Sequence, residues 1–162
     1  MKGGSMQVPM TPRRILKRAV KLYPEKIAVV DGEMRLTYTQ VQQRANQVVN
    51  AVQGLGIAAG RILALLDYNT YRYMEMYFGM ADSGRVLLPL NIRLSAEEYT
   101  YILNNAEAEA IIFHSDFKPV VDKLRQSSET LKYFFIAEGP AVEEWITGTY
   151  EELIDGASAD PV

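Results

Sequence analysis

Four short apolar stretches, separated by segments with helical periodicity, most constrain how this chain can fold. They cover residues 61–66, 86–90, 109–113 and 133–137. Strands that are apolar along their whole length are typical of parallel sheets whose two faces are both covered by helices. The alternation of such strands with helical segments therefore predicts an α/β fold, in which a mainly parallel sheet is flanked by helices. Ahead of them, the turn signal Asp31-Gly32 between two short extended segments predicts a β-hairpin.

Polar signals mark where the intervening helices begin. Thr37 with Gln40, and Ser95 with Glu98, match the capping box, in which two side chains satisfy free backbone N–H groups at a helix start. Asn69 is expected to cap the helix that follows the first apolar stretch, because asparagine is a favoured N-cap residue. These signals place helices between successive strands.

The composition excludes several classes of protein. Apolar residues make up 48% of the 162 residues and charged residues 23%, which is typical of globular proteins. The net charge of −3 and the scattered basic residues predict no nucleic-acid binding. No apolar run approaches the roughly 20 residues that a membrane-crossing helix needs, so no transmembrane segment is expected. The absence of cysteine excludes disulfides and thiolate metal sites, and it fits a cytoplasmic protein.

The densest basic stretch falls in one predicted helix near the amino end and comprises Arg13, Arg14, Lys17, Arg18 and Lys21. We interpret this stretch as the solvated face of that helix. A membrane-surface or nucleic-acid patch is the alternative, but the acidic residues Glu25 and Asp31 follow soon after and argue against it.

Few residues are candidates for catalysis. No phosphate-binding Gly-x-x-x-x-Gly-Lys loop is present. Gly54 and Gly56 only superficially resemble a dinucleotide-binding turn, because their spacing is wrong and they follow a helix and precede a strand. A flavodoxin-like ligand-binding protein is a weaker alternative, since no strand here is followed by a glycine-rich turn into a helix start that could hold a phosphate. His114, the only histidine, stands beside Ser115 and Asp116, but three consecutive residues cannot converge as a catalytic triad. A lone histidine is also a poor metal site, so we expect no catalytic and no metal-binding residue.

Three segments carry a family resemblance through their order and spacing. The first is Leu-Thr-Tyr at residues 36–38, followed by a helix and Leu-Gly-Ile at 55–57. The second reads Asn-Thr-Tyr-Arg-Tyr-Met-Glu-Met-Tyr-Phe at 69–78, and the third reads Gly-Arg-Val-Leu-Leu-Pro-Leu-Asn-Ile-Arg-Leu-Ser at 84–95. Together they resemble the first part of the AMP-forming adenylating enzymes, which include acyl-CoA synthetases, luciferases and the adenylation domains of peptide synthetases. The second and third segments look most like the branch that activates medium- and long-chain fatty acids.

The resemblance implies a two-step reaction for a full-length parent ligase. A fatty-acid carboxylate attacks the α-phosphate of ATP, which gives an acyl-adenylate and pyrophosphate, and the thiol of CoA then displaces AMP. ATP, magnesium and CoA are the implied cofactors of that parent, with magnesium offsetting the phosphate charge. The phosphate loop, the adenine-binding segment and the carboxy-terminal lysine of the family all correspond to positions beyond Val162. We therefore expect an amino-terminal fragment that is inactive and binds no cofactor by itself.

The expected organisation has three parts. Residues 1–6 resemble the remnant of an expression tag, residues 7–156 form a partial amino-terminal ligase domain, and residues 157–162 form a linker-like tail. A stand-alone, non-catalytic binding or oligomerisation module is the alternative to a ligase fragment. A domain cut from a larger one exposes apolar faces, so we expect self-association, by exchange of elements between two chains.

Asn91 and Arg93 are the candidate cofactor-binding residues. In related ligases the segment equivalent to residues 90–93 lies near the adenine end of bound CoA. The resemblance therefore implies that Arg93 contacts a CoA phosphate, with Asn91 beside it. The alternative is that Arg93 anchors the helix that starts at Ser95, or pairs with Glu97.

Overall fold

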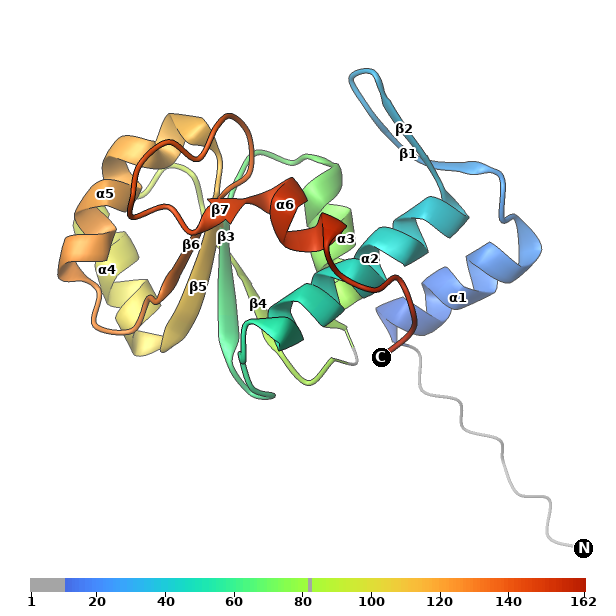
Figure 1. Ribbon diagram of the computed structural model, residues 1–162, viewed down its shortest axis with the longest axis horizontal. Helices are drawn as coiled ribbons and strands as arrows, with labels where there is room; N and C mark the ends of the chain where they lie inside the picture. The colour runs from blue at the N-terminus through green and yellow to red at the C-terminus, as the bar shows by residue number, and fades with distance from the viewer. Residues whose placement is uncertain (1–10, 82) are drawn as a thin grey trace, which may run out of the picture.

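The computed structural model describes residues 11–81 and 83–162, so the expected tag remnant and the first residues of the expected ligase domain lie outside it. In the described residues the chain forms a two-stranded hairpin sheet and a five-stranded sheet (Figure 1). The strands are β1 (Ile27–Asp31), β2 (Met34–Thr37), β3 (Ile62–Leu66), β4 (Val86–Pro89), β5 (Ala108–Phe113), β6 (Tyr133–Ile136) and β7 (Gly148–Thr149). The helices are α1 (Pro12–Leu22), α2 (Tyr38–Gly54), α3 (Tyr71–Met80), α4 (Ala96–Asn105), the short 3-10 turn η1 (Ser115–Phe117), α5 (Lys118–Ser127) and α6 (Tyr150–Asp155).

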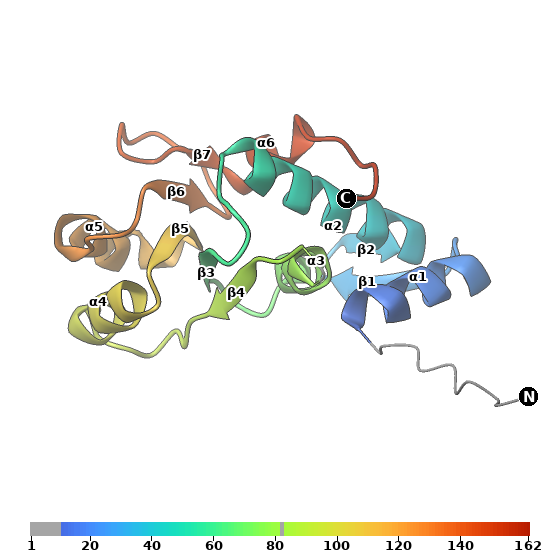
Figure 2. The same ribbon diagram turned by 90° about the horizontal axis from the view of Figure 1, so that it is seen from below.

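The five-stranded sheet is parallel throughout, with the strand order β4-β3-β5-β6-β7. Helices α2, α3 and α6 cover one face of this sheet, and α4 and α5 cover the other. Figures 1 and 2 show the arrangement from two directions, with α4 and α5 on one side of the sheet and α2 and α3 on the opposite side. The α/β fold predicted from the apolar stretches is therefore confirmed, including the mainly parallel sheet and its flanking helices.

The central strands are apolar along their whole length because they separate two cores. Leu63 and Leu65 of β3 belong to the core beneath α2, α3 and α6. Ala64 and Leu66 belong to the core beneath α4 and α5. Successive side chains of a strand point to opposite faces, so a polar residue at any of these positions would be buried. β5 is likewise buried at all six of its positions.

Pro89 lies in the edge strand β4, at a position where the missing N–H of proline removes no hydrogen bond to the neighbouring strand β3. The N–H groups of Val86 and Leu90 donate to carbonyls on the β3 side, at 3.0 and 2.9 Å. Because successive backbone groups alternate in direction along a strand, Leu87 and Pro89 face away from β3. The missing N–H of proline therefore removes no hydrogen bond from the sheet.

The hairpin and both capping boxes are confirmed. β1 and β2 pair in antiparallel fashion, and Gly32 takes the positive φ of 55° that this tight turn requires. Thr37 with Gln40 begins α2, and Ser95 with Glu98 begins α4, each through the reciprocal pair of hydrogen bonds. None of the helices in the described part of the chain is long and apolar enough to cross a membrane.

The start of α3 corrects one prediction. The N-cap residue is Thr70 rather than Asn69, and the Thr70 hydroxyl makes no capping bond but donates to Asp67 (2.9 Å). The N–H of Tyr71 donates instead to the carboxylate of Asp31 in the hairpin (3.0 Å). The group that caps α3 thus comes from a segment 40 residues earlier, which a local pattern does not reveal.

Part of the segment expected to be a linker-like tail lies along α2. The side-chain amides of Asn46 and Asn50 donate to the backbone carbonyls of Ala159, Ser158 and Asp160, at 2.7 to 3.0 Å. These bonds hold the backbone that follows α6 against the helix. The assignment of residues 157–162 as a linker stays a prediction.

Candidate functional site

The carboxyl edge of the parallel sheet is the candidate functional site. After β3 the chain enters α3 on one face of the sheet, and after β5 it passes through η1 into α5 on the other face. Because β3 and β5 are neighbours, the loops that leave them diverge at a topological switch point. Ligands of open α/β sheets bind in such crevices, outside the carboxyl ends of the strands.

Aromatic and titratable side chains from three strand ends meet at this edge. The ring of Tyr68, just after β3, lies edge-on to His114 with 4.9 Å between centroids, and 5.4 Å from the ring of Phe117. The Tyr68 hydroxyl donates to Asp116 (3.0 Å). The Nε2 atom of His114 lies 3.2 Å from a carboxylate oxygen of Glu138, which follows β6. Two residues distant in the sequence, Tyr68 and Glu138, thus lie against His114 and Asp116.

The two ring nitrogens of His114 face different partners. Nδ1 accepts a hydrogen bond from the N–H of Asp116 (3.1 Å), so the neutral ring carries its proton on Nε2, toward Glu138. Across residues 11–81 and 83–162, no three histidine or carboxylate side chains are grouped so that they could hold a metal ion. The hydrogen bond to Asp116 raises the pKa of the Tyr68 phenol. The cluster can therefore orient a polar group, but it presents no activated nucleophile.

An open cavity of about 250 Å³ lies beside Tyr68, between the loops that follow β3 and β4. Its lining consists of Asp67, Tyr68, Asn69, Tyr73, Leu90, Asn91 and Ile92. The buried carboxylate of Asp67 accepts hydrogen bonds from the N–H of Tyr68 (2.8 Å) and from the hydroxyl of Thr70 (2.9 Å). The same carboxylate lies 3.5 Å from Nη1 of Arg72, a buried residue of α3. Asp67 is therefore occupied by its own loop and by Arg72, and the polar groups left to meet a ligand are the amides of Asn69 and Asn91.

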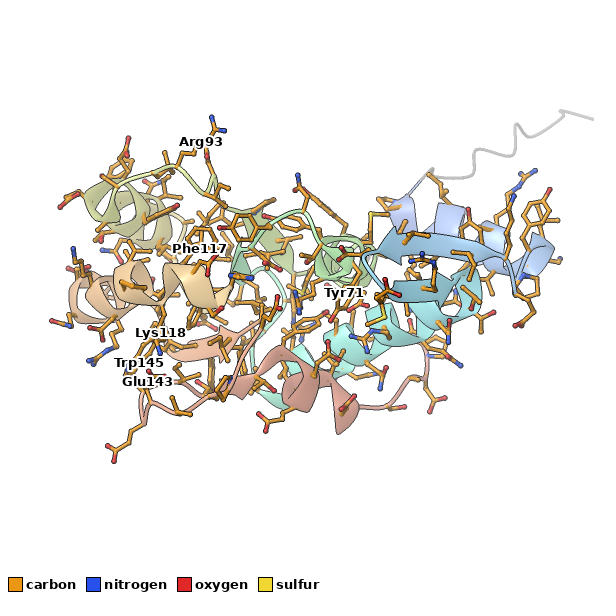
Figure 3. The ribbon with its side chains drawn as sticks, turned by 90° about the horizontal axis from the view of Figure 1, so that it is seen from above. Tyr71, Arg93, Phe117, Lys118, Glu143 and Trp145 are labelled. Carbon is orange, nitrogen blue, oxygen red and sulfur yellow. The ribbon has the colours of Figure 1, made fainter. Side chains whose placement is uncertain are left out.

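Asn91 and Arg93, the predicted CoA contacts, lie on the loop after β4. Asn91 lines the cavity, and its Oδ1 accepts the N–H of Arg93 (3.0 Å). Its carbonyl accepts the hydroxyl of Tyr99, a buried residue of α4 (2.7 Å), which fixes the loop. The exposed side chain of Arg93 extends outward from the molecule (Figure 3). Within the described part of the chain it makes no ion pair with Glu97, so its guanidinium is open to an anionic ligand.

A second polar cluster, which sequence analysis missed, lies between α2, α3 and α6. Arg44 of α2 donates from Nε to Glu75 of α3 (2.5 Å) and from Nη2 to Glu151 of α6 (2.9 Å). The hydroxyls of Tyr71 and Tyr150 donate to Glu151 and Glu75, at 2.8 and 2.7 Å. The Arg44 guanidinium also lies 5.5 Å from the ring centroid of Tyr71, labelled in Figure 3. Three helices are thus held together by one network of charge-assisted hydrogen bonds.

Burial dominates the electrostatics of this network. The side chain of Glu75 has no solvent exposure, and burial raises the pKa of its carboxyl against the hydrogen bonds and charge of Arg44, which lower it. Burial also raises the pKa of the Tyr150 phenol, and the charge of Glu75 adds to that shift. Glu75 and Tyr150 are buried, whereas Arg44 and Glu151 are 19% and 41% exposed, so the network is closed on the side of the core and reaches solvent at Glu151. Because every one of its charged side chains is paired within the network, its role is to hold the helices in place. The signal that could have revealed it is Glu75, which stands between Met74 and Met76 in a predicted helix. The residues beside Arg44 are mostly polar and give no such signal.

Comparisons with known proteins agree with this fold. The AMP-binding enzyme family matches residues 16–158. The long-chain-fatty-acid–CoA ligase of Thermus thermophilus is 36% identical over 151 residues, which cover 91% of this chain and 27% of that protein. The crystal structure of the anthranilate CoA ligase AuaEII in complex with anthranoyl-AMP has a TM-score of 0.88 at 26% identity, covering 99% of this chain and 30% of that one.

The part of the ligases that corresponds to this chain is their amino-terminal region. The inhibitor-bound N-terminal domain of FACL13 from Mycobacterium tuberculosis has a TM-score of 0.83 at 26% identity, covering 95% of this chain and 37% of that one. The chain spans less than a third of the length of the Thermus ligase and of AuaEII. The chain therefore belongs to the AMP-binding enzyme family and corresponds to the amino-terminal region of its acyl-CoA ligases.

Proposed function

We propose that this chain is the amino-terminal scaffold of an ATP-dependent, AMP-forming ligase that joins long- or medium-chain fatty acids to CoA. The observation that carries the proposal is the 36% identity to the Thermus thermophilus long-chain ligase across 91% of the chain. The segments at residues 69–78 and 84–95, which resemble fatty-acid-activating ligases, support it. These two segments form α3 and the loop after β4, and both contribute to the lining of the cavity at the carboxyl edge.

By itself the chain is proposed to be inactive. Attack on ATP requires groups that stabilise the charge developing on the transferred phosphate. The carboxyl edge offers two other groups instead. One is the carboxylate of Asp67, which accepts a hydrogen bond from its own loop, and the other is the phenol of Tyr68, whose pKa is raised. In a whole ligase, ATP, magnesium and CoA would be bound together with segments outside this one. The test is to incubate the purified chain with a long-chain fatty acid, ATP, magnesium and CoA; sustained pyrophosphate release would overturn the proposed inactivity.

A chimeric ligase tests the proposed function directly. In it, this chain replaces the matching amino-terminal segment of the Thermus thermophilus ligase, which supplies the rest of the protein. We expect the chimera to release pyrophosphate and to form acyl-CoA from a long-chain fatty acid, whereas the remaining Thermus segment alone does neither. A chimera that is folded by circular dichroism and binds ATP, but forms no acyl-adenylate from any fatty acid, would contradict the proposal.

Arg93 is proposed to bind a phosphate of CoA in such a ligase. In the chimera, Arg93→Ala is expected to raise the KM for CoA about tenfold or more, because a hydrogen bond to a charged group contributes about 1.5–3 kcal/mol. The KM for ATP should not change, and Arg93→Lys should recover part of the loss because it keeps the charge without the planar fork. Arg61→Ala is the matched control, because Arg61 directly precedes β3 and so lies at the amino ends of the parallel strands, away from the carboxyl edge. An equal rise in the KM for CoA in both alanine variants would contradict the proposal that Arg93 binds a phosphate of CoA.

We also propose that the isolated chain associates with a second copy of itself. Met74 and Tyr77 on α3 and Val86 on β4 are exposed apolar side chains on two elements that adjoin each other. Exposed apolar surface of this kind favours association. Light scattering is expected to show a dimer that Tyr77→Ser weakens, and exchange of elements between the chains would make its dissociation slow. A monomer at the highest attainable concentration would contradict this proposal.

A further inference from the structure

Helix α1 differs in charge from the rest of the molecule. Its sequence contains five basic side chains and no acidic one. Since the whole chain carries a net charge of −3, the residues outside α1 carry a net charge of −8. Lys17, Arg18 and Lys21 are exposed and form no ion pair within residues 11–81 and 83–162. The helix lies at one end of the molecule, away from α4 and α5 (Figures 1 and 2).

The surface of α1 is divided into three stripes. Leu16 and Val20, four residues apart, face the molecule, and Leu16 is only 3% exposed. The basic stripe comprises Arg14, Lys17, Arg18 and Lys21. Ile15 and Leu22 are seven residues apart, which is about two helical turns, so they share a third stripe beside the basic one. They are 53% and 54% exposed.

Further exposed apolar side chains follow directly after α1. Tyr23 is 56% exposed, and the ammonium group of Lys26 lies 5.5 Å from the centroid of its ring. Ile27 and Val30 of β1 are exposed as well. Isolated apolar residues on a surface need no explanation, but Ile15 and Leu22 share one face of α1 next to the basic stripe, and an exposed apolar patch rimmed by polar residues marks an interaction surface.

We propose that α1 and the turn that joins it to β1 bind to the surface of an anionic lipid membrane. In this mode Ile15 and Leu22 enter the boundary between the headgroups and the acyl chains, while the neighbouring cations contact the lipid phosphates. The interpretation of this stretch as a solvated face rested on charge alone, and the exposed apolar stripe is what the structure adds. Nucleic acid would also attract the basic stripe, but its phosphate backbone offers no apolar environment for Leu22.

Co-sedimentation with vesicles tests the proposal on the whole chain. Phosphatidylcholine vesicles that contain about 30% phosphatidylserine are expected to bind the chain at least tenfold more strongly than phosphatidylcholine alone. Lys17→Ala should lower the partition coefficient about fivefold, which is the contribution of one cation near an anionic surface. Leu22→Ser should lower it about tenfold, because one apolar side chain no longer enters the lipid.

Matched controls lie at the other end of the molecule, where Lys123 is exposed on α5 and Val142 is 71% exposed in the loop between β6 and β7. Lys123→Ala and Val142→Ser are expected to change binding by less than about twofold. Circular dichroism establishes that each variant is folded, and the result does not depend on ligase activity. The proposal is overturned if the chain stays in the supernatant with anionic vesicles, or if Lys123→Ala weakens binding as much as Lys17→Ala does. It is also overturned if a DNA duplex binds as strongly and Leu22→Ser weakens neither complex, because the contact would then be purely ionic.

Discussion

Replacing Arg44 with methionine is expected to destabilise the chain far more than the loss of a surface ion pair would. Its partner Glu75 is fully buried and accepts hydrogen bonds from Nε and Nη2 of Arg44 (2.5 and 3.3 Å) and from the hydroxyl of Tyr150 (2.7 Å). Methionine removes two of these three bonds together with the positive charge. Breaking a buried pair costs about 3–5 kcal/mol. We expect a loss of about 3 kcal/mol in the free energy of unfolding, at the low end of this range. The reason is that Arg44 is itself 19% exposed, and its second partner, Glu151, is 41% exposed.

The size of this loss is expected to depend on pH. Burial raises the pKa of Glu75, and removing Arg44 takes away the interaction that opposes burial, so the pKa rises further in the folded variant. A carboxyl with a higher pKa in the folded state favours folding below its unfolded pKa of about 4.3, and this advantage is lost as the pH rises through the folded pKa. The deficit of Arg44→Met relative to the parent should therefore be largest at about pH 8 and should shrink toward about pH 5.

Urea unfolding followed by circular dichroism measures the difference. Arg61→Met is the matched control, because Arg61 also pairs with two glutamates, Glu107 and Glu109 (3.2 and 3.3 Å), but is 45% exposed. It should change the free energy of unfolding by less than about 1 kcal/mol. The double variant Arg44→Met/Glu75→Met removes both charges and should recover most of the loss. Equal losses for Arg44→Met and Arg61→Met, or a deficit that is the same at every pH, would refute this reasoning.

Close packing and hydrogen bonding between the helices give further predictions. Gly79→Ala is expected to lower the free energy of unfolding by about 1–3 kcal/mol, because its Cβ would lie 2.8 Å from the carbonyl oxygen of Ala45 in α2. Gly54→Ala, at the end of α2, would meet nothing within 4 Å and should gain about 0.5 kcal/mol in the same urea assay; a loss matching that of Gly79→Ala would rule out the steric explanation. Tyr150→Phe should cost about 1–3 kcal/mol, because Glu75 loses a buried donor, and a melting temperature equal to that of the parent would show that the bond is dispensable.

Features that depend on neighbours along the chain were predictable from the sequence. The capping boxes at Thr37 and Ser95 need only residues three positions apart, and both are present. The apolar stretch at 109–113 predicts a strand that is buried on both faces, and all six residues of β5 are buried. Such signals give the identity of each element and the face that it buries. They therefore sufficed for the fold class.

Contacts between distant segments were not predictable in this way. Tyr68 meets Asp116, 48 residues later, because β3 and β5 are neighbours in the sheet. The strand order that makes them neighbours is not encoded in any local pattern. Asn69 failed as a cap for the same reason: propensity ranks asparagine above threonine at this position, but the hydrogen bonds of Asp31 and Asp67 decide how the helix begins.

With Pro89 on its outer side, β4 presents a single outward N–H, that of Leu87, at the open edge of the five-stranded sheet. A β-strand of another chain that approaches this edge would find only one backbone N–H donor. The hydrogen-bond ladder of a fibril requires a continuous row of such donors. Among the described residues, Pro89 therefore leaves the outer side of β4 without the continuous row of donors that pairing with a strand of another chain requires.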